Sequence, residues 1–269
     1  MIKAAFFDID GTLVSLRTKA FPNSAQEAIR RLRARGILCF VATGRSKFEI
    51  AQEHLLEDVA FDGYLTNNGQ DAYGADGALL YGKALHPDDA AAVYRWVKET
   101  GCACWMVSAS HSRINLVNER VTTAMEAIHT RLPEIGDLTP MLQAPVYKIV
   151  LFLPRGEMSA PLALAPHSRM TQWFRLGHDL ISKDGGKRAA MLGILQRYGL
   201  TAENAVAFGD SENDIEMLQA AKIGVAMGNA TPECIAAADY VTADCDEDGL
   251  VRALSHFGLY TPPASVPAL

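Results

Sequence analysis

The chain has 269 residues, of which 49% are hydrophobic, and its formal net charge at pH 7 is −6. This composition is that of a globular protein that can bury a sizeable core, and it excludes the disordered and fibrous classes. The acidic balance argues against a nucleic-acid partner, because binding to the phosphate backbone requires a basic surface.

No apolar run reaches the ~18 residues that a membrane-spanning helix needs, and the start, MIKAAFFDIDG, has too short an apolar core for a signal peptide. Five scattered cysteines fit reduced thiols better than a disulfide framework. We therefore expect a cytoplasmic protein with no membrane partner. The sequence leaves the oligomeric state open.

The first predicted element is a strand over residues 4–7, AAFF. This apolar, aromatic-rich run is bounded by a turn signal, which favours a strand buried on both faces. Asp8 and Asp10 then follow just past its carboxyl end. The next residue, Gly11, would let the backbone turn and bring these two side chains around one site.

The first third of the chain alternates between strand-like and helix-like segments. Ser24 and Glu27 have the spacing of a capping box and predict the start of a helix that ends at Gly36. An apolar run, ILCFVA, then leads into Thr43, Gly44 and Arg45. A helix near 46–56 and a short strand within DGYLTNNG follow, and this order predicts a parallel sheet covered on both faces.

The last third resumes the same alternation, whereas the middle third differs. Strands in the middle interchange polar and apolar residues more often, which fits a sheet with one wet face. We therefore expect a catalytic core of residues 1–82 plus 183–269, with residues 83–182 inserted as a second α/β domain. The tail, YTPPASVPAL, has three prolines in ten residues and is expected to be loosely ordered. The later core elements are predicted as helices near 187–198, from 211 and at 247–257, with strands within AVAFGD and IGVAMG.

Polar residues follow the predicted core strands, at the edge where parallel sheets bind ligands. An acid cluster assembled from distant segments raises its own pKa values unless a cation is present. A hard divalent ion such as Mg²⁺ resolves that repulsion with oxygen ligands. The residues concerned are Asp8 with Asp10, Thr43 with Gly44, and Asp210 with Asn213 and Asp214.

Four short motifs, in order, resemble those of the haloacid dehalogenase superfamily. They are DIDGT, ATGR, a lysine opening a late helix at Lys187, and GDSENDIEML. TNNG and GVAMGNA further resemble the Cof-type subfamily, in which a large cap is inserted between the second and third motifs. The resemblance covers about 1–82 and 183–258. It implies a Rossmann-like, doubly wound parallel sheet with an inserted α/β cap that contributes substrate specificity.

The resemblance also implies roles for the motif residues. Asp8 would attack phosphorus to form an aspartyl phosphate, and Asp10 would exchange protons with the leaving group and with water. Lys187 and Mg²⁺ would reduce the repulsion between phosphate and nucleophile. Arg188 follows Lys187 where the family usually has glycine, and Lys183 is close by. Lys183 and Arg188 are therefore alternative candidates for the role given to Lys187. Mg²⁺ would be held by Asp8, Asp210 and the backbone carbonyl of Asp10, with Asp214 completing or orienting the shell. Phosphoryl oxygens would be bound by the Thr43 hydroxyl, the Gly44 amide and Asn213. Arg45 would either reach the substrate or pair with an acid.

The expected function is a Mg²⁺-dependent phosphatase of small phosphorylated metabolites, sugar phosphates first. A phosphotransferase or phosphomutase on the same core is the enzymatic alternative, and a non-catalytic ligand-binding regulatory protein is the alternative from another class. Within the insertion, Trp173, Arg175 and His178 rank first as substrate contacts, because they lie just before the chain returns to the core. No carboxylate cluster in the insertion suggests a second metal. Its other candidates are His86, His111, His129, His167 and Trp105.

Overall fold

The computed structural model describes residues 1–54, 56–128 and 131–261. His129 and residues 262–269 of the proline-containing tail lie outside the described residues. The chain divides into two compact units. The first unit comprises Met1–Gly44, His54–Leu80 and the chain from Lys187 onward, and the inserted unit comprises Arg45–Glu53 and Tyr81–Gly186. The predicted insertion, 83–182, lies inside the second of these ranges, whereas the grouping of Arg45–Glu53 with it was not predicted.

The first unit is built on a sheet that, among the described residues, has eight strands in the order β14-β13-β12-β1-β2-β3-β4-β5. The strands from β14 to β3 pair in parallel, and β4 then turns back antiparallel to β3. The predicted parallel core is therefore present, and the β3–β4 hairpin is an addition to it. The strands are β1 (Ala4–Phe7), β2 (Leu38–Ala42), β3 (Gly63–Thr66), β4 (Asp71–Gly74), β5 (Leu79–Gly82), β12 (Ala205–Gly209), β13 (Ile223–Ala226) and β14 (Tyr240–Val241).

Aromatic rings fix β1 in the middle of this sheet. Phe6 is in register with Phe40 of β2, and their rings stack with centroids 5.0 Å apart. Phe7 is in register with Phe208 of β12, and those rings stack at 5.2 Å. Because neighbouring residues on a strand point to opposite faces, each stack belongs to a different face of the sheet. All four residues of β1 are fully buried, as an apolar run in a covered parallel sheet should be.

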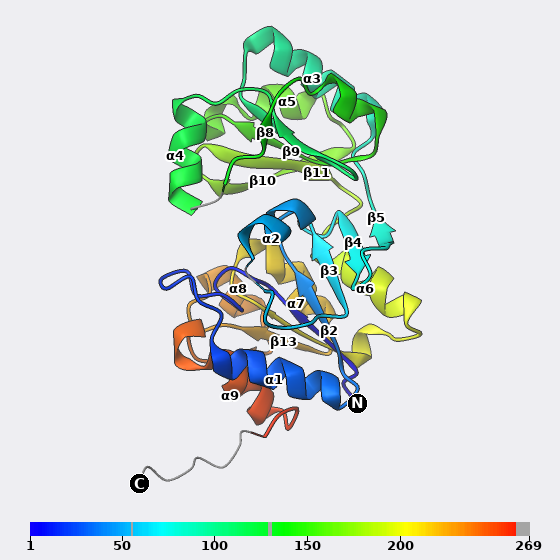
Figure 1. The fold of residues 1–269 in the computed structure, drawn as a ribbon, viewed down its shortest axis with the longest axis vertical. Helices are drawn as coiled ribbons and strands as arrows, with labels where there is room; N and C mark the ends of the chain where they lie inside the picture. The colour runs from blue at the N-terminus through cyan, green and yellow to red at the C-terminus, as the bar shows by residue number, and fades with distance from the viewer. Residues whose placement is uncertain (55, 129–130, 262–269) are drawn as a thin grey trace. The chain divides into compact units, whose positions relative to one another are not determined.

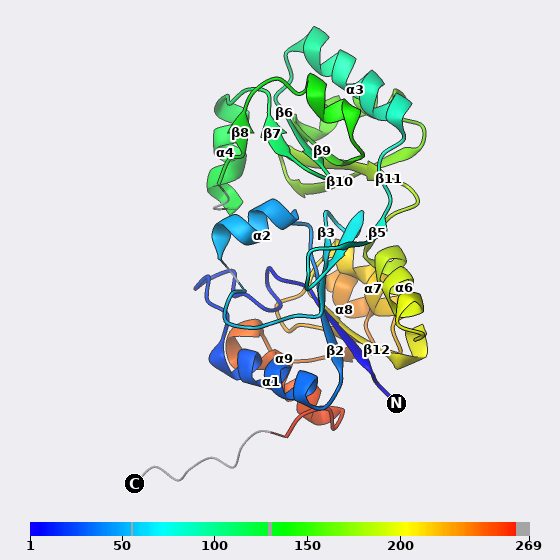
Figure 2. The same ribbon diagram turned by 45° about the vertical axis from the view of Figure 1, so that its right-hand side comes forward.

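Helices cover both faces of the first unit's sheet. α1 (Asn23–Ala34) packs with α9 (Gly249–His256) and β2, while α7 (Ile215–Ala220) packs with β12, β13 and its neighbours α6 (Lys187–Arg197) and α8 (Pro232–Ala237). Figures 1 and 2 show α1 beside α9, and α6 and α7 on the other side of the strands. Single-turn 3₁₀ helices occur at Ala202–Asn204, Glu212–Asp214 and Cys245–Glu247.

The predicted capping box at Ser24 is wrong. α1 begins at Asn23 after Pro22, no side chain caps it, and the Ser24 hydroxyl donates to Asp248 Oδ1 at 2.5 Å instead. A reciprocal pair of this kind occurs before α2 (Lys47–Glu53). There the Ser46 amide donates to Glu49 Oε2 at 2.7 Å, and the Glu49 amide donates to Ser46 Oγ at 3.3 Å. This is the capping-box arrangement.

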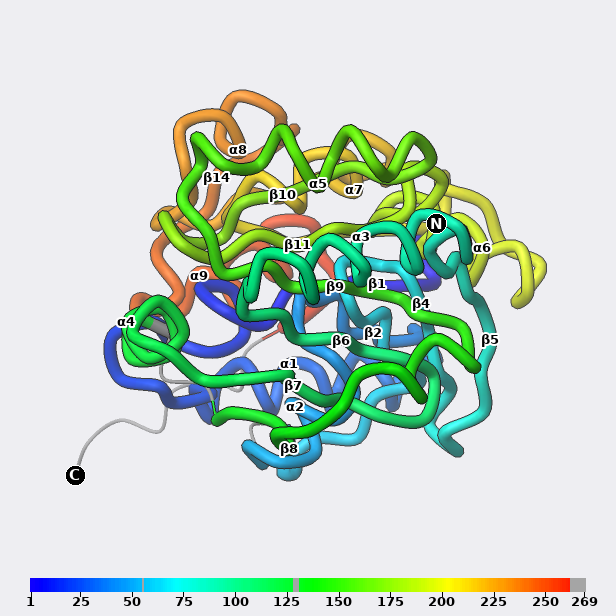
Figure 3. The backbone as a smooth tube through the Cα atoms, turned by 90° about the horizontal axis from the view of Figure 1, so that it is seen from above, coloured from blue at the N-terminus to red at the C-terminus, as the bar shows by residue number. Residues whose placement is uncertain are grey.

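The inserted unit has its own sheet, with the order β10-β11-β9-β6-β7-β8 in the part of the chain that the structure describes. Figure 3 shows β10, β11, β9, β6 and β7 side by side in this order. The strands are β6 (Cys104–Ser108), β7 (Ser112–Ile114), β8 (Glu134–Ile135), β9 (Val146–Phe152), β10 (Ser168–Phe174) and β11 (Gly177–Ser182). The helices are α2, α3 (Pro87–Thr100), α4 (Glu119–Ile128) and α5 (Ser159–Ala163), with 3₁₀ turns at Thr139–Gln143 and Arg155–Glu157.

Both faces of this second sheet bury apolar side chains. One cluster joins Val93 and Val97 of α3 to Leu151 of β9, and the other joins Val121 of α4 to Phe152. The inserted sheet is therefore covered on both sides at its centre, in contrast to the wet face that its alternating sequence predicts. Within the described residues, no helix is both long and apolar enough to cross a membrane.

Candidate active site

Three strands of the first unit end at one edge and bring the predicted polar residues together. Phe7 of β1 is in register with Val41 of β2 and with Phe208 of β12. Asp8 directly follows Phe7, and Thr43 and Asp210 each follow within two residues of its partners. Because parallel strands share a carboxyl edge, these side chains meet there. Asp8, Thr43 and Asp210 are all buried.

Two glycines make room for the carboxylates. Gly11 has φ +86°, and a Cβ there would lie 2.3 Å from Asp210 Oδ2. A Cβ on Gly209 would lie 2.4 Å from the carboxyl carbon of Asp214. These distances are shorter than any normal contact, so a side chain at either position would displace a carboxylate. Gly11 has a positive φ at the predicted turn, and the absence of a side chain there makes room for Asp210.

Lys187 lies between two of the acids. Its Nζ donates to Asp8 Oδ1 and to Asp214 Oδ1, each at 2.6 Å, and its side chain has no exposed surface. Lys187 is the first residue of α6, in agreement with the motif that places a lysine at the start of a late helix. Of the two alternative candidates for this role, Lys183 donates to the carbonyl of Pro166, and Arg188 is exposed. The structure therefore places Lys187 alone of these three among the acids.

The electrostatics of this group are strongly perturbed. Burial raises the pKa of Asp8 well above its usual range, Lys187 opposes this, and Asp214, Asp210 and Asp10 add to the rise. Burial and then the Asp214 carboxylate raise the pKa of Asp210 to about 7. Burial lowers the pKa of Lys187, but the Asp214 and Asp8 carboxylates outweigh it and leave this pKa raised. One ammonium group thus faces several carboxylates that cannot all ionise easily.

Asp214 is held by the 3₁₀ turn that it ends, Glu212–Asp214. Its Oδ2 accepts hydrogen bonds from the backbone amides of Asp210 and Ser211, both at 3.1 Å, while Oδ1 is bound by Lys187. Asp210 in turn accepts a long hydrogen bond from Thr12 Oγ1, at 3.4 Å. Both Asp214 oxygens are therefore engaged by the protein, which suits it to orienting Asp210 and Lys187.

Asp10 differs from the other acids. It is partly exposed, and it lies near enough to raise the pKa of both Asp8 and Asp210. Its carboxylate does not belong to the close group formed by Asp8, Asp210 and Asp214. Its side chain is thus beside the cluster, where it can exchange protons with a bound molecule, while its backbone carbonyl is a separate oxygen donor.

The second motif is tied to the fourth through Asn68, a residue that the sequence analysis did not single out. The Asn68 amide donates to the Thr43 carbonyl at 2.9 Å, and its Oδ1 accepts from Asn213 Nδ2 at 2.9 Å. Its Oδ1 also lies 3.0 Å from the position of a Cβ on Gly44. Asn68 therefore contacts three of the predicted phosphate-binding residues. Its sequence signal is the TNNG segment, which resembles a feature of the Cof-type subfamily and predicts no role for Asn68.

Arg45 belongs to the inserted unit and pairs with an acid. Its Nη1 lies 2.5 Å from Glu53 Oε2, and both side chains are largely buried. Of the two roles left open for Arg45, the ion pair is the one that the structure contains.

The three insertion residues ranked as substrate contacts have different environments. Trp173 packs against the β6–β9 core and donates to Asp179 Oδ1 at 2.9 Å. Arg175 is exposed and lies over the Phe174 ring. His178 is fully buried in β11, which leaves its ring no surface for a substrate. The expectation of a substrate contact is therefore wrong for His178.

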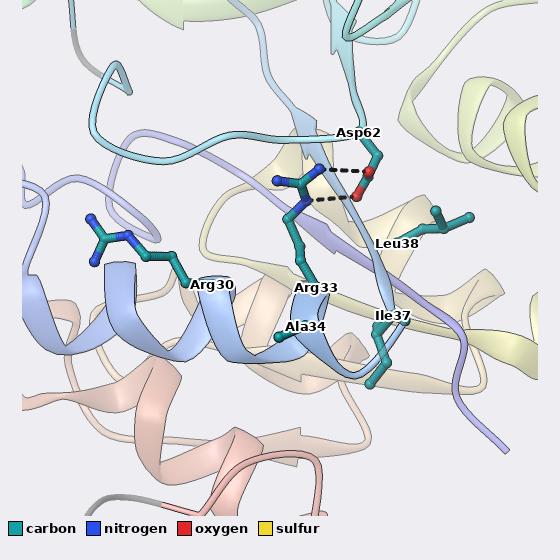
Figure 4. A pocket seen from close by; sticks show the side chains of 7 residues that line it. Arg30, Arg33, Ala34, Ile37, Leu38 and Asp62 are labelled. Atoms are coloured by element: carbon teal, nitrogen blue, oxygen red, sulfur yellow. Dashed lines mark hydrogen bonds and ion pairs between the residues drawn. The ribbon is translucent and has the colours of Figure 1, made fainter.

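A pocket in the first unit lies away from these residues. Figure 4 shows Arg33 pointing toward Asp62, and the two form a paired contact at 3.0 and 3.1 Å. The lining includes Leu38, the first residue of β2, so this pocket is at the amino end of that strand. Thr43 follows the carboxyl end of the same strand. Asp62 also accepts the Cys39 amide, which gives the Arg33–Asp62 pair a structural role.

The donor set fits a hard divalent cation. One carboxylate oxygen from each of Asp8, Asp210 and Asp214 lies within 4.8 Å of the others, and all three residues are buried. Oxygen donors without nitrogen or sulfur are typical of Mg²⁺ sites. Burial is the main cause of the raised pKa values of Asp8 and Asp210, and the neighbouring carboxylates add to both although Lys187 opposes them. A bound cation would offset that repulsion between carboxylates.

Comparison with known proteins connects this geometry to a family. The sequence profile of the haloacid dehalogenase-like hydrolases matches residues 5–254. A provisionally named bifunctional phosphatase/peptidyl-prolyl cis-trans isomerase of Streptococcus pyogenes serotype M6 is 30% identical over 100% of this chain, which spans 56% of that protein. A provisionally named phosphatase of Bacillus subtilis (strain 168) is 29% identical over 96% of this chain and 98% of its own length. Among solved structures, a sugar phosphatase of haloacid dehalogenase subclass IIB superposes with a TM-score of 0.82 at 33% identity, covering 96% of this chain and all of that one.

Proposed function

This chain belongs to the haloacid dehalogenase-like hydrolases, and from that membership we propose that it is a Mg²⁺-dependent phosphatase of small phosphorylated metabolites, with sugar phosphates first. The observation that carries the proposal is Lys187 bridging Asp8 and Asp214 beside Asp210, at the carboxyl edge of the sheet. The likeness to a subclass IIB sugar phosphatase over nearly the whole chain supports the choice of sugar phosphates.

Asp8 is the proposed nucleophile. Lys187 holds Oδ1, which fixes the rotation of the carboxylate about its Cβ–Cγ bond. The carboxylate attacks phosphorus, the bond between phosphorus and the ester oxygen breaks, and an aspartyl phosphate forms. This divides hydrolysis into two easier displacements.

Asp10 is the proposed acid and base. It gives its proton to the departing ester oxygen, which leaves as an alcohol. It then takes a proton from the water that attacks phosphorus, so that inorganic phosphate departs and Asp8 is restored. The partial exposure of Asp10 allows it to meet both the leaving group and water.

The other side chains bind and orient the phosphoryl group. The Thr43 hydroxyl, the Gly44 amide and the Asn213 carboxamide are proposed donors to its oxygens, and Lys187 contributes positive charge. Asp8, Asp210 and the Asp10 carbonyl are the proposed Mg²⁺ ligands, with Asp214 orienting Asp210. When bound, Mg²⁺ supplies charge that offsets the repulsion between phosphate and the carboxylates.

The test is phosphate release from a panel of sugar phosphates, nucleotides and vitamin phosphates, with Mg²⁺ and with EDTA. We expect release that EDTA stops, that Asp8→Asn abolishes, and that Asp10→Ala slows by about 10² to 10⁴-fold. Asp58→Asn, which changes an exposed carboxylate of the same unit, is the matched control and should retain activity.

The same samples report Mg²⁺ binding independently of turnover, through the rise in unfolding temperature that a bound ion produces. That rise should disappear in Asp210→Asn and persist in Asp58→Asn. Release unaffected by EDTA, or an active Asp8→Asn variant, would refute the proposed mechanism.

A further inference from the structure

A second group of metal-ligating side chains lies in the inserted unit. One donor atom from each of His86, Asp89 and His167 lies within 4.8 Å of the other two. His86 precedes α3, Asp89 is in the first turn of that helix, and His167 precedes β10. Asp89 and His167 are 78 positions apart in sequence, so only the fold brings them together.

Asp89 is the member of the group whose side-chain orientation the protein fixes. Its side chain is 2% exposed, and Oδ2 accepts hydrogen bonds from the His167 amide at 2.9 Å and the Ser168 hydroxyl at 2.7 Å. Oδ1 faces His167 Nδ1 at 3.0 Å. The carboxylate is thus held in one orientation by two donors, with its other oxygen directed at an imidazole.

The two imidazoles lie together and are open to solvent. The rings of His86 and His167 stack with centroids 4.4 Å apart, and the side chains are 45% and 59% exposed. An ion can therefore reach the group from solvent. His86 Nδ1 accepts the Asp88 amide at 3.3 Å and caps α3, a contact that the His86 ring gives up if it turns. Asp88, which is 93% exposed, has an oxygen 3.8 Å from His86 Nδ1 and adds negative charge, while Lys183 binds the Pro166 carbonyl on the His167 side.

We propose that His86, Asp89 and His167 bind one divalent transition-metal ion of the Zn²⁺ class. Donors of a tetrahedral Zn²⁺ site, with bonds of about 2.0–2.1 Å, are about 3.3 Å apart. The 3.0 Å separation of His167 Nδ1 and Asp89 Oδ1 is already close to that value. The ion takes the place of the hydrogen between these two atoms, and the neutral His167 ring then carries its proton on Nε2. His86 completes the protein ligands by rotating its half-exposed ring.

This site differs in chemistry from the acidic cluster of the first unit. Two imidazoles and one carboxylate favour Zn²⁺ or Ni²⁺, whereas the all-carboxylate group of Asp8, Asp210 and Asp214 favours Mg²⁺. A bound ion would fasten the start of α3 to the start of β10. Its effect should therefore be on the stability of the inserted unit, whether or not the proposed phosphatase activity is correct.

The experiment measures Zn²⁺ affinity by competition with a chromophoric chelator, on full-length protein kept in excess Mg²⁺ to occupy the acidic cluster. We expect one Zn²⁺ per chain in the unaltered protein, and binding weakened by at least about tenfold in His86→Ala and in His167→Ala. His111→Ala removes an exposed histidine of the same unit and should bind Zn²⁺ like the unaltered protein.

A second measurement excludes the free cysteines as ligands. Co²⁺ substituted for Zn²⁺ should give visible d–d absorption without the ultraviolet charge-transfer band of a thiolate. Zn²⁺ should also raise the unfolding temperature of the unaltered protein and of His111→Ala, and leave the other two variants unchanged. Absence of Zn²⁺ binding, a thiolate band, or equal affinity in all three variants would overturn the proposal.

Discussion

Asn213 Nδ2 donates to Asn68 Oδ1 at 2.9 Å, although 145 positions separate the two residues. Asn68 has φ 58°, a left-handed conformation that costs most residues energy and that Asn tolerates better than most. The conformation turns its carboxamide toward Asn213 while its amide binds the Thr43 carbonyl. We infer that Asn68 is a positioning residue for the proposed phosphate site.

Replacement of Asn68 by Gly should therefore weaken the phosphate site without straining the backbone. Gly accepts the positive φ but removes the hydrogen-bond acceptor for Asn213. We expect kcat/KM for the preferred phosphate ester to fall by up to about tenfold, the worth of one net hydrogen bond, with the unfolding temperature nearly unchanged. Asn68→Ala should also lower the free energy of unfolding, because alanine is strained in a left-handed backbone conformation. If Asn68→Gly had full activity, Asn213 would not depend on this contact.

Loss of Lys187 should destabilise the first unit. Lys187→Met leaves buried Asp8 and Asp214 without their cation, and removing one member of a buried ion pair costs about 3 kcal/mol or more. Urea unfolding in EDTA measures this change in free energy. Lys222→Met removes an exposed cation, paired with Glu203 at 2.8 Å, and should lower the free energy of unfolding far less, because solvent screens an exposed pair. Equal losses in the two variants would show that the buried carboxylates adapt by taking up protons.

Gly11→Ala should disturb Asp210 as well as the backbone. Gly11 and Gly36 have similar positive φ values, +86° and +79°, but a Cβ on Gly36 meets nothing within 4 Å. Gly36→Ala should thus show only the left-handed strain, about 1–2 kcal/mol in the free energy of unfolding. Gly11→Ala should cost more and also remove the stabilisation by Mg²⁺, because the new methyl group displaces the Asp210 carboxylate. Thermal unfolding with and without Mg²⁺ measures both effects, and an undiminished Mg²⁺ response would contradict this account.

His178 should make stability depend on pH. Burial, and then the charge of Arg155, lower the pKa of its ring below the usual 6.5. The unfolded chain therefore takes up a proton below pH 6.5 that the folded chain resists. Folding stability should fall as the pH drops below 6.5, by up to about 1.4 kcal/mol per pH unit until the folded-state pKa is reached.

The comparison is urea unfolding at pH 7 and pH 5 for the unaltered protein and for His178→Leu. Neither ring nitrogen of His178 has a hydrogen-bond partner among the described residues, so an apolar replacement leaves no polar group unpaired. The difference between the two pH values should shrink in His178→Leu and persist in His111→Ala. An unchanged difference in His178→Leu would assign the pH dependence to other groups.

The sequence predicts the central sheet well because its strands are short, apolar and buried on both faces. β1, β2, β12 and β13 all lie within the predicted runs. The β3–β4 hairpin was not predicted, since it depends on three consecutive left-handed residues, Asn67, Asn68 and Gly69. The capping box at Ser24 failed because Asp248, far along the chain, takes its hydroxyl.

The site residues also divide into those that a local sequence pattern predicts and those whose roles depend on contacts between distant segments. Strand ends were enough to propose Asp8 and Asp210, and the resemblance of the motifs to the superfamily added Lys187 at a helix start. The carboxamide of Asn68 and the group around Asp89 depend on contacts between segments far apart in sequence. The TNNG segment and the two histidines stand out in the sequence, but no local pattern predicts their partners, which only the folded chain brings together.

The central place of β1 has a consequence for biosynthesis. Its first residue, Ala4, is in register with Ala205 of β12, so the strand cannot complete its sheet until about 200 further residues have been made. At roughly 5–20 residues per second, that interval is about 10–40 s. During that interval Phe208, the residue whose ring stacks on Phe7 in the folded protein, has not yet been made. Most of the inserted unit, in contrast, comes from the continuous stretch Tyr81–Gly186 and can fold while the nascent chain still lacks β12. Chaperones that bind exposed aromatic segments on the ribosome would therefore have time to bind this strand, which directly precedes the proposed nucleophile, before β12 has been made.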